Sequence, residues 1–119
     1  MMSGFAENFE DMEVWIEARR LANHIFDHFE TLKVFGFRDQ ILNASTSVMN
    51  NIAEGFDRHS KKDFAHFLVI AKGSSGEVRS MLYLAEDRNY ITAREAEPLR
   101  AAYKILSSRI GALAASLRK

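Results

Sequence analysis

Apolar residues recur every three or four positions along most of the chain, which is the repeat of an amphipathic helix rather than of a strand. The repeat predicts helices over residues 11–30, 37–56, 61–87 and 92–117. Each of these segments carries an apolar stripe on one side, as a helix does when it faces a shared core. Because short links join them, neighbouring helices should be antiparallel, and the sequence predicts an all-α, up-and-down four-helix bundle.

Polar residues mark where two of the helices begin. Ser60 followed by Asp63, and Thr92 followed by Glu95, have the spacing of a capping box, in which side chains bond the free N–H groups of a first turn. Pro98 lies a turn inside the last helix, where it removes a backbone donor. The pattern therefore predicts a kink, or a helix that restarts, at this proline.

Glycines give two further signals. Gly55 lies near the end of the second helix, where glycine is the usual C-terminal residue. Gly73 and Gly76 lie in the middle of the third helix, which each glycine weakens by about 1 kcal/mol relative to alanine. A break into two helices is the alternative, but the apolar stripe stays in phase across these positions. We expect one unbroken helix whose small residues let a neighbouring backbone approach closely.

Composition indicates a single globular domain. The chain has 119 residues, of which 47% are hydrophobic and 27% are charged. We assign residues 9–119 to the domain and residues 1–8 to a flexible N-terminus. Cysteine is absent, which excludes disulfides, thiolate metal sites and cysteine nucleophiles. No segment approaches the roughly 20 apolar residues of a membrane span and no targeting segment is recognisable, so we expect a cytoplasmic protein without membrane contact.

Charge is balanced in total but not along the chain. Formal net charge is zero, with 16 basic and 16 acidic residues, which argues against a monomer that seeks phosphate strongly. Residues 1–30 hold seven acids against two arginines, whereas residues 98–119 hold five lysines or arginines and no acid. We expect the acidic first helix and the basic last helix to attract one another, within one subunit or between subunits.

The second and third helices carry more apolar residues than one core requires. The second also has a row of amides and hydroxyls on its polar side, where Lys and Glu are the usual residues of a solvated face. Extra apolar faces and such a polar row are typical of subunit contacts, although an ordinary solvated face explains the polar row equally well. The residues assigned to a subunit interface are Gln40, Leu42, Ser47, Met49, Asn51, Glu54, Phe56, Ile70 and Met81.

A basic cluster follows the second helix. Arg58, Lys61 and Lys62 lie where the third helix begins, and the free N–H groups of a first helical turn add to the attraction for phosphate. Acidic neighbours in the same run make a solvated turn the simpler interpretation. As candidates for nucleic-acid contacts we assign Arg58, Lys61, Lys62, Arg100 and Lys104.

No group of residues has the spacing of a catalytic or metal centre. His24 and His28 share one side of the first helix, and three further candidate ligands lie near the start of the third, but zinc needs three or four converging ligands. The sequence lacks the Glu-x-x-His motifs of di-iron bundles, a nucleophile with its base, and a phosphate-cradling glycine loop. We therefore expect no enzymatic activity, no metal site and no cofactor.

The second helix and its exit carry a family resemblance. Residues 40–48, 51–56 and 58–64 resemble the four-helix-bundle proteins encoded by intervening sequences within large-subunit ribosomal RNA genes. That family is similar to the accessory variability protein of diversity-generating retroelements. The resemblance implies an antiparallel four-helix bundle that assembles into a ring, typically a homopentamer, without known enzymatic activity. For the retroelement relatives it also implies binding to nucleic acid and to a reverse transcriptase.

Two departures from that family shape the functional hypothesis. Leu42 and Asn43 stand where family members usually carry a basic pair, and Met49 stands where a proline is frequent. Two missing positive charges per subunit weaken a phosphate-binding surface considerably. The leading hypothesis is a non-enzymatic oligomeric interaction platform for structured RNA or DNA. The alternative is a purely protein-binding or structural homo-oligomer that binds no nucleic acid.

Overall fold

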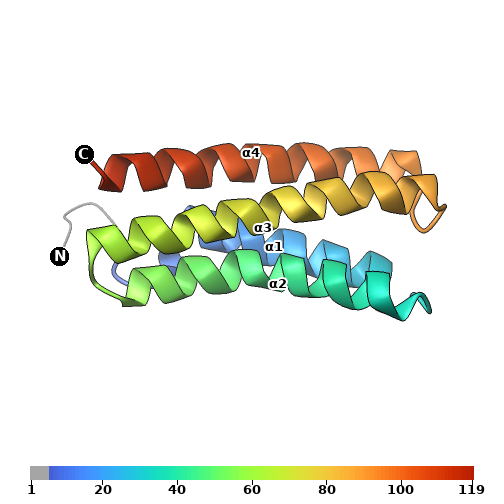
Figure 1. Cartoon of the computed structure of the whole chain (residues 1–119), viewed down its shortest axis with the longest axis horizontal. Helices are drawn as coiled ribbons and strands as arrows, with labels where there is room; N and C mark the ends of the chain where they lie inside the picture. Colours follow the sequence, from blue (N-terminus) through green and yellow to red (C-terminus); the bar gives the residue numbers. More distant parts are fainter. Residues whose placement is uncertain (1–5) are drawn as a thin grey trace.

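The computed structural model describes residues 6–119, which form a bundle of long helices that lie side by side along one axis (Figure 1). The elements are the short 3-10 helix η1 (Phe9–Asp11) and the α-helices α1 (Glu13–Phe29), α2 (Phe35–Asp57), α3 (Lys61–Asp87) and α4 (Ala93–Leu117). Each α-helix contacts the next one along the chain, and α1 also contacts α4. The all-α, up-and-down arrangement is confirmed, and the described residues contain no strand.

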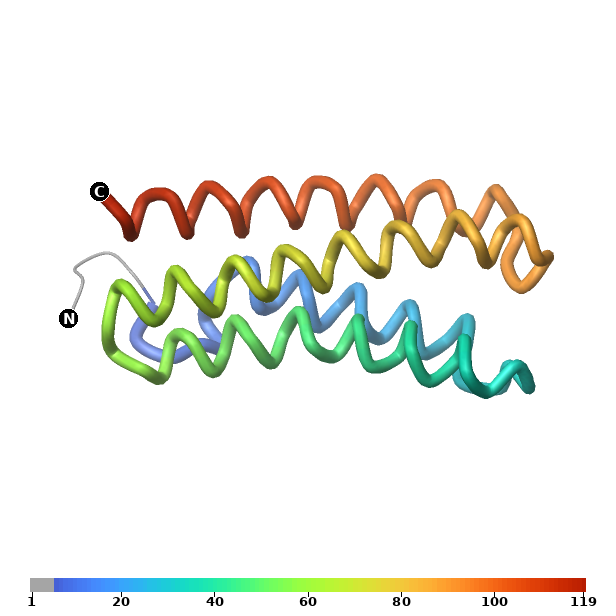
Figure 2. The backbone as a smooth tube through the Cα atoms, viewed as in Figure 1, coloured from blue at the N-terminus to red at the C-terminus, as the bar shows by residue number. Residues whose placement is uncertain are grey.

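The two ends of the bundle differ in what they bring together (Figure 2). One end holds the turn between α2 and α3 and the C-terminal turn of α4. The other end holds the links from α1 to α2 and from α3 to α4. Residues of α4 near position 117 therefore lie beside the first turn of α3. The predicted flexible segment 1–8 falls for the most part on residues 1–5, outside the described part of the chain.

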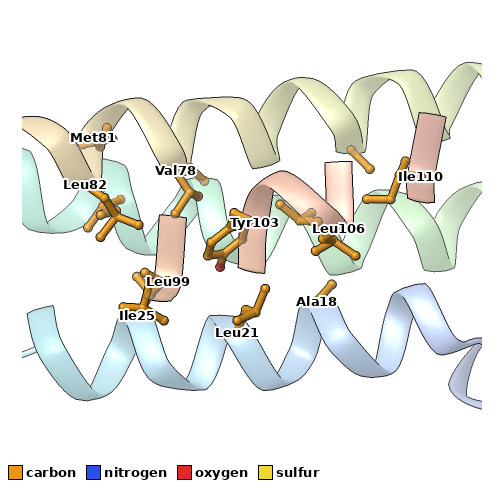
Figure 3. Packing of buried hydrophobic residues seen from close by; sticks show 14 of the residues in the cluster. Ala18, Leu21, Ile25, Val78, Met81, Leu82, Leu99, Tyr103, Leu106 and Ile110 are labelled. Atoms are coloured by element: carbon orange, nitrogen blue, oxygen red, sulfur yellow. The ribbon is translucent and has the colours of Figure 1, made fainter. Parts of the chain in front are cut away.

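The core runs the length of the bundle and is almost wholly apolar. Leu21 and Ile25 of α1 face Leu99 and Tyr103 of α4 across it, and the phenol oxygen of Tyr103 points towards α1 (Figure 3). The helical spacing of α1 predicts Trp15 in its apolar stripe, but the large ring lies at the edge of the core, where it stacks edge-on with Phe9 at 5.2 Å between centroids. The wholly buried positions of α1 include Ala18, Leu21, Ile25 and Phe29.

Small residues let α3 approach both of its neighbours. Gly55 is buried inside the last turn of α2, where an added Cβ would lie only 2.6 Å from Cβ of Phe67. On the other side, Ser75 Oγ lies 2.7 Å from Ser107 Oγ of α4 and donates to the carbonyl of Tyr103 at 3.2 Å. Gly55 lies near the end of α2, as predicted, but it does not terminate the helix. The glycine permits a close helix contact, and the left-handed residue after the helix is His59, with φ 57°.

The other local predictions concern helix ends and interruptions. Thr92 and Glu95 form the predicted capping box, and Ser60 Oγ accepts from the backbone N–H of Asp63. α4 continues through Pro98 as one element, so the helix does not restart there. α3 is unbroken, as predicted. Just beyond its end, Asn89 has a left-handed backbone conformation, with φ 60°.

The glycines within α3 do not play the role expected of them inside one chain. A Cβ added at Gly73 or Gly76 would meet nothing within 4 Å among the described residues. The close approach of a neighbouring backbone that we expected at these glycines is therefore absent from the single bundle. Instead, both lie on the outer side of α3, away from the core.

Candidate functional site

A groove lies at the end of the bundle where α3 begins and α4 ends. It has a volume of about 580 Å³, opens to solvent, and is lined by Lys61, Lys62, Asp63, His66, Leu117 and Arg118. Its position follows from the antiparallel packing of α3 and α4, which places the last turn of one beside the first turn of the other. Three cations and one carboxylate surround it, so the groove has a net positive charge.

The backbone adds to the attraction of this groove for anions. The first turn of α3 leaves N–H groups without partners in the helix, and Ser60 satisfies only that of Asp63. The two lysines are exposed to solvent. Lys61 and Lys62 were predicted phosphate contacts, whereas Arg118 and His66 were not. Arg118 and His66 can be assigned to the groove only from the antiparallel register of α3 and α4. That register is known only once the fourth helix is known to pack on the third.

Arg58 belongs to the same end of the bundle but is already engaged. Its guanidinium donates to Glu54 Oε1 at 2.8 Å and lies over the ring of Phe67, 5.1 Å from the centroid. The side chain remains half exposed, so one face of the guanidinium is still accessible. The pair with Glu54 weakens what Arg58 contributes to a phosphate site, because the nearby carboxylate repels the same anion.

Arg100, a predicted nucleic-acid contact, is engaged within the chain. Its guanidinium donates to Glu86 at 2.8 Å and stacks on Tyr83 at 4.2 Å, and the side chain is only 12% exposed. Lys104 is exposed, but thirteen residues separate it from Leu117, which is about 20 Å along a helix. The five predicted cations therefore do not form one surface, and Lys104 lies far from the groove.

The polar row predicted for the second helix forms a seam between α2 and α3. Ser47 and Ser74 share a hydrogen bond of 2.9 Å, and Asn51 donates to Ser47 Oγ at 2.9 Å. Farther along, Gln40 donates to Glu77 at 3.2 Å. The Ser47–Ser74 and Gln40–Glu77 bonds hold α2 to α3 within one chain, whereas the bond from Asn51 to Ser47 lies within α2. Of the other predicted interface residues, Glu54 and Ile70 border the same surface and are exposed.

The remaining predicted interface residues are placed differently. Leu42, Met49 and Phe56 follow each other by seven positions on another flank of α2, where they pack partly buried against the core. Met81 is 8% exposed and belongs to the core itself. The core of a single chain therefore accounts for Met81, whereas Leu42, Met49 and Phe56 remain partly exposed and their assignment to a subunit interface stays a prediction.

The acidic first helix and the basic last helix meet within one chain. Arg109 donates to Glu13 at 2.6 Å, and His28 lies 3.6 Å from Glu95. Beside this contact, the hydrogen bond from Arg20 holds the pKa of the Glu17 carboxyl below its usual range. The Arg109–Glu13 pair is of the predicted kind, with the base on α4 and the acid on α1, whereas in the His28–Glu95 pair the acid lies on α4. The predicted attraction is therefore observed within one chain at one pair.

Two further features bear on chemistry in the described residues. The hydroxyl of Tyr103 is buried without a hydrogen-bond partner in residues 6–119, and burial raises its pKa above the ordinary value. No cluster of three or more His, Asp or Glu side chains arises in that part of the chain, so His24 and His28 gain no third ligand there. In the same residues, none of the helices is both long and apolar enough for a membrane span.

Comparison with known proteins identifies the relatives of this chain. The family model described as 23S rRNA-intervening sequence protein matches residues 10–112. Among solved structures, the chain is similar to a protein of unknown function from the S23 ribosomal protein family of Bacteroides thetaiotaomicron, with 28% sequence identity and a TM-score of 0.74. The match covers 89% of this chain and 98% of the other. No curated protein matches the sequence significantly.

Proposed function

Because this chain belongs to the 23S rRNA-intervening sequence protein family, we propose that it is a non-enzymatic platform, working as a homo-oligomer in the cytoplasm, that holds the phosphate backbone of structured RNA. The observation that carries the proposal is the groove at the end of the bundle, where Lys61, Lys62 and Arg118 gather around an open space. A ring of five subunits, as the family resemblance implies, repeats this groove around one axis.

The groove is suited to recognising the phosphate backbone of a nucleic acid rather than to catalysing a reaction. Lysine and arginine bind phosphate through charge, and the free N–H groups of a first helical turn add hydrogen bonds, but neither reads a base sequence. Each subunit of an oligomer adds its own cations, so several weak phosphate contacts act on one polynucleotide. The net charge of the chain is zero, but phosphate binding depends on the charge close to the groove rather than on the total charge. An oligomer repeats this local positive charge in every subunit.

Reversal of charge at the groove tests the proposal. The variant Lys61→Glu/Lys62→Glu should bind a fluorescently labelled RNA stem-loop at least tenfold more weakly in anisotropy titrations, and the salt slope of log K should fall by about 2. The fold should persist, because acids in the first turn of α3 suit the helix dipole.

The matched control reverses two charges at the opposite end of the bundle. Lys33 lies in the link before α2 and Arg38 in its first turns, so Lys33→Glu/Arg38→Glu changes the net charge equally. This control should keep most of the affinity and the salt slope. Equal losses in both double variants would show that only total charge matters, and unchanged binding in the first would remove the groove from the proposal.

A second candidate function is a homo-oligomer that binds only protein. It is favoured by the engagement of Arg100 with Glu86 and Tyr83, which withdraws this cation from the surface near the link between α3 and α4. The same titration separates the two candidates. An oligomer that shows no RNA binding even at low salt would support the protein-only function.

A further inference from the structure

One of the residues that line the groove is a histidine. His66 lies there with three cations, the carboxylate of Asp63 and the apolar Leu117. Lysine, arginine and aspartate side chains ordinarily keep their charge between about pH 5 and 8, whereas histidine ordinarily gains or loses its charge in this range. The charge of the groove can therefore change with pH at one position.

The place of His66 on α3 directs it to the same anion as the cations. His66 follows Lys62 by four residues and Asp63 by three, so all three share one side of the helix. Arg118, which lies just beyond α4, closes the groove opposite them. The imidazole is exposed and lies edge-on to the ring of Phe67, with 5.8 Å between the centroids. An anion held by the groove would therefore lie within reach of this ring.

The two histidines of α1 differ from His66 because they already have partners. His24 Nε2 lies 3.3 Å from the guanidinium of Arg20, and His28 Nδ1 lies 3.6 Å from Glu95. Among residues 6–119, by contrast, no hydrogen bond or ion pair engages the imidazole of His66. Both of its ring nitrogens are therefore available to a ligand.

The charged groups around His66 come from two helices. Lys62 and Asp63 of α3 and Arg118 after α4 face it across the groove, with Lys61 beside them. Positive charge exceeds negative charge among these groups, so the groove attracts an anion even when the imidazole is neutral. A bound phosphate then places negative charge beside the imidazole, which favours the protonated form. Proton binding and phosphate binding therefore strengthen each other.

The turn after α2 adds little net charge beside His66. Arg58 and Glu54 form a pair at 2.8 Å, in which the two charges largely cancel. The other charged or titratable residues of this turn are Asp57 and His59, which are both exposed. The residues that line the groove, rather than those of the turn, therefore decide which ligand approaches His66.

From these positions, we infer that His66 is a fourth phosphate contact of the groove, one that acts in its protonated form. The groove then takes up a proton when it binds RNA, and it holds RNA more tightly as pH falls from about 8 to about 5.5. The inference rests on the proposed function, because it requires that the groove holds phosphate, and it adds how acidity regulates that site.

The size of the effect follows from one added charge in each subunit. A neutral imidazole offers one N–H donor, whereas the protonated ring offers two donors and a positive charge. A charge-assisted hydrogen bond to phosphate is roughly twice as strong as a neutral one. One more phosphate contact also steepens the dependence of log K on log salt by about 0.7–0.9. An oligomer repeats this gain in each groove that contacts the same RNA.

Two substitutions fix the charge at position 66. His66→Gln keeps a polar side chain that stays neutral, and His66→Lys carries a positive charge throughout this pH range. Both should fold, because the position is exposed and both residues are good helix formers. The matched control is His24→Gln, which removes an exposed histidine eleven residues after the start of α1, about 17 Å along that helix.

Anisotropy titrations with a labelled RNA stem-loop at fixed ionic strength compare the four proteins at about pH 5.5 and about pH 8. The wild type and His24→Gln should bind about threefold or more tightly at the lower pH. His66→Gln should lose more than half of that gain on a logarithmic scale. His66→Lys should bind at the higher pH about as tightly as the wild type does at the lower pH.

The contrary results separate the inference from the proposed function. If His66→Gln keeps the whole pH dependence, or if the wild type binds equally at both pH values, the inference is overturned and the groove stands as a phosphate site. Equal losses in His66→Gln and His24→Gln also overturn it, because total charge then accounts for the gain. A wild type that binds no RNA at either pH overturns the proposed function together with the inference.

Calorimetry measures the proton directly. Titration of RNA into the protein at about pH 6.5, in two buffers with different ionisation enthalpies, gives the number of protons exchanged on binding. The wild type should take up protons, and His66→Gln should take up fewer than half as many. Proton release by the wild type, or equal uptake by both proteins, would overturn the role of His66.

Discussion

Replacement of Gly55 by alanine measures how closely α2 and α3 must approach. In an open helix position this change stabilises a protein by about 1 kcal/mol, because alanine is the better helix former. Here the new Cβ would lie 2.6 Å from Cβ of Phe67, 3.1 Å from Cδ1 of Phe64 and 3.3 Å from the carbonyl oxygen of Phe64. The nearest atom is bonded directly to the backbone of α3, so a rotamer change cannot relieve the overlap.

The magnitude follows from these two opposing effects. Relief requires α2 and α3 to separate by about 1 Å near their turn, and such overpacking typically costs about 1–3 kcal/mol. After the gain in helix propensity of about 1 kcal/mol is subtracted, we expect Gly55→Ala to lower the free energy of unfolding by up to about 2 kcal/mol. For a domain of this size that corresponds to a fall in Tm of up to about 8 °C.

Thermal unfolding followed by circular dichroism at one fixed protein concentration is the assay, since self-association makes Tm depend on concentration. Gly36→Ala is the matched control, because a Cβ added there meets nothing within 4 Å. We expect this control to leave Tm unchanged or slightly raised. A Gly55→Ala protein at least as stable as the wild type would refute the reasoning, because it would show that α2 and α3 accommodate a methyl group between them.

Three further predictions concern single contacts. Ser75→Ala and Ser107→Ala should each lower the free energy of unfolding by about 1 kcal/mol. The double variant should lose less than the sum of the two, because no hydroxyl is then left without its partner. Additive losses in urea unfolding would contradict this prediction. Hydrogen bonds from Thr92, first from its side chain and then from its backbone, hold the pKa of Glu95 below the usual range, so the stabilisation is complete above the ordinary Glu pKa and is lost as pH falls below it. An NMR titration should show this low pKa, and Thr92→Val should return it towards normal; an unchanged pKa in that variant would disprove the cause. His59→Gly should raise the free energy of unfolding by up to ~1 kcal/mol, because glycine adopts φ 57° without strain, and a lower Tm would contradict the prediction.

The elements of the fold could be predicted from the sequence because burial imposes a period on the chain. Four long stripes at helical spacing leave few alternatives to a bundle, and α3 was recognised as unbroken because its stripe stays in phase across Gly73 and Gly76. The period gives the face of each helix but not its exact rotation. Helical spacing therefore predicts Trp15 in the core stripe of α1, although the large ring lies at the edge of the bundle and Leu21 is the buried residue.

Partners across the bundle could not be predicted in the same way. Arg100 follows the buried Leu99 by one position, which places it on a flank, but only the packing of α4 on α3 decides that Glu86 and Tyr83 lie opposite. The same is true of Arg118, which enters the groove through the register of α3 and α4. The position of Met81 beside the main stripe of α3 predicts a residue outside the core, yet Met81 is buried with the core cluster.

The central claim is that this family member acts as an oligomer that holds RNA through local positive charge. The most direct measurement is light scattering across a size-exclusion peak of gently purified wild-type protein, with absorbance at the wavelengths of nucleic acid and of protein, at low and then moderate salt. The account predicts a particle several times the 13.6 kDa of one chain, carrying RNA that dissociates as salt rises. A single-chain particle free of RNA at low salt would contradict it.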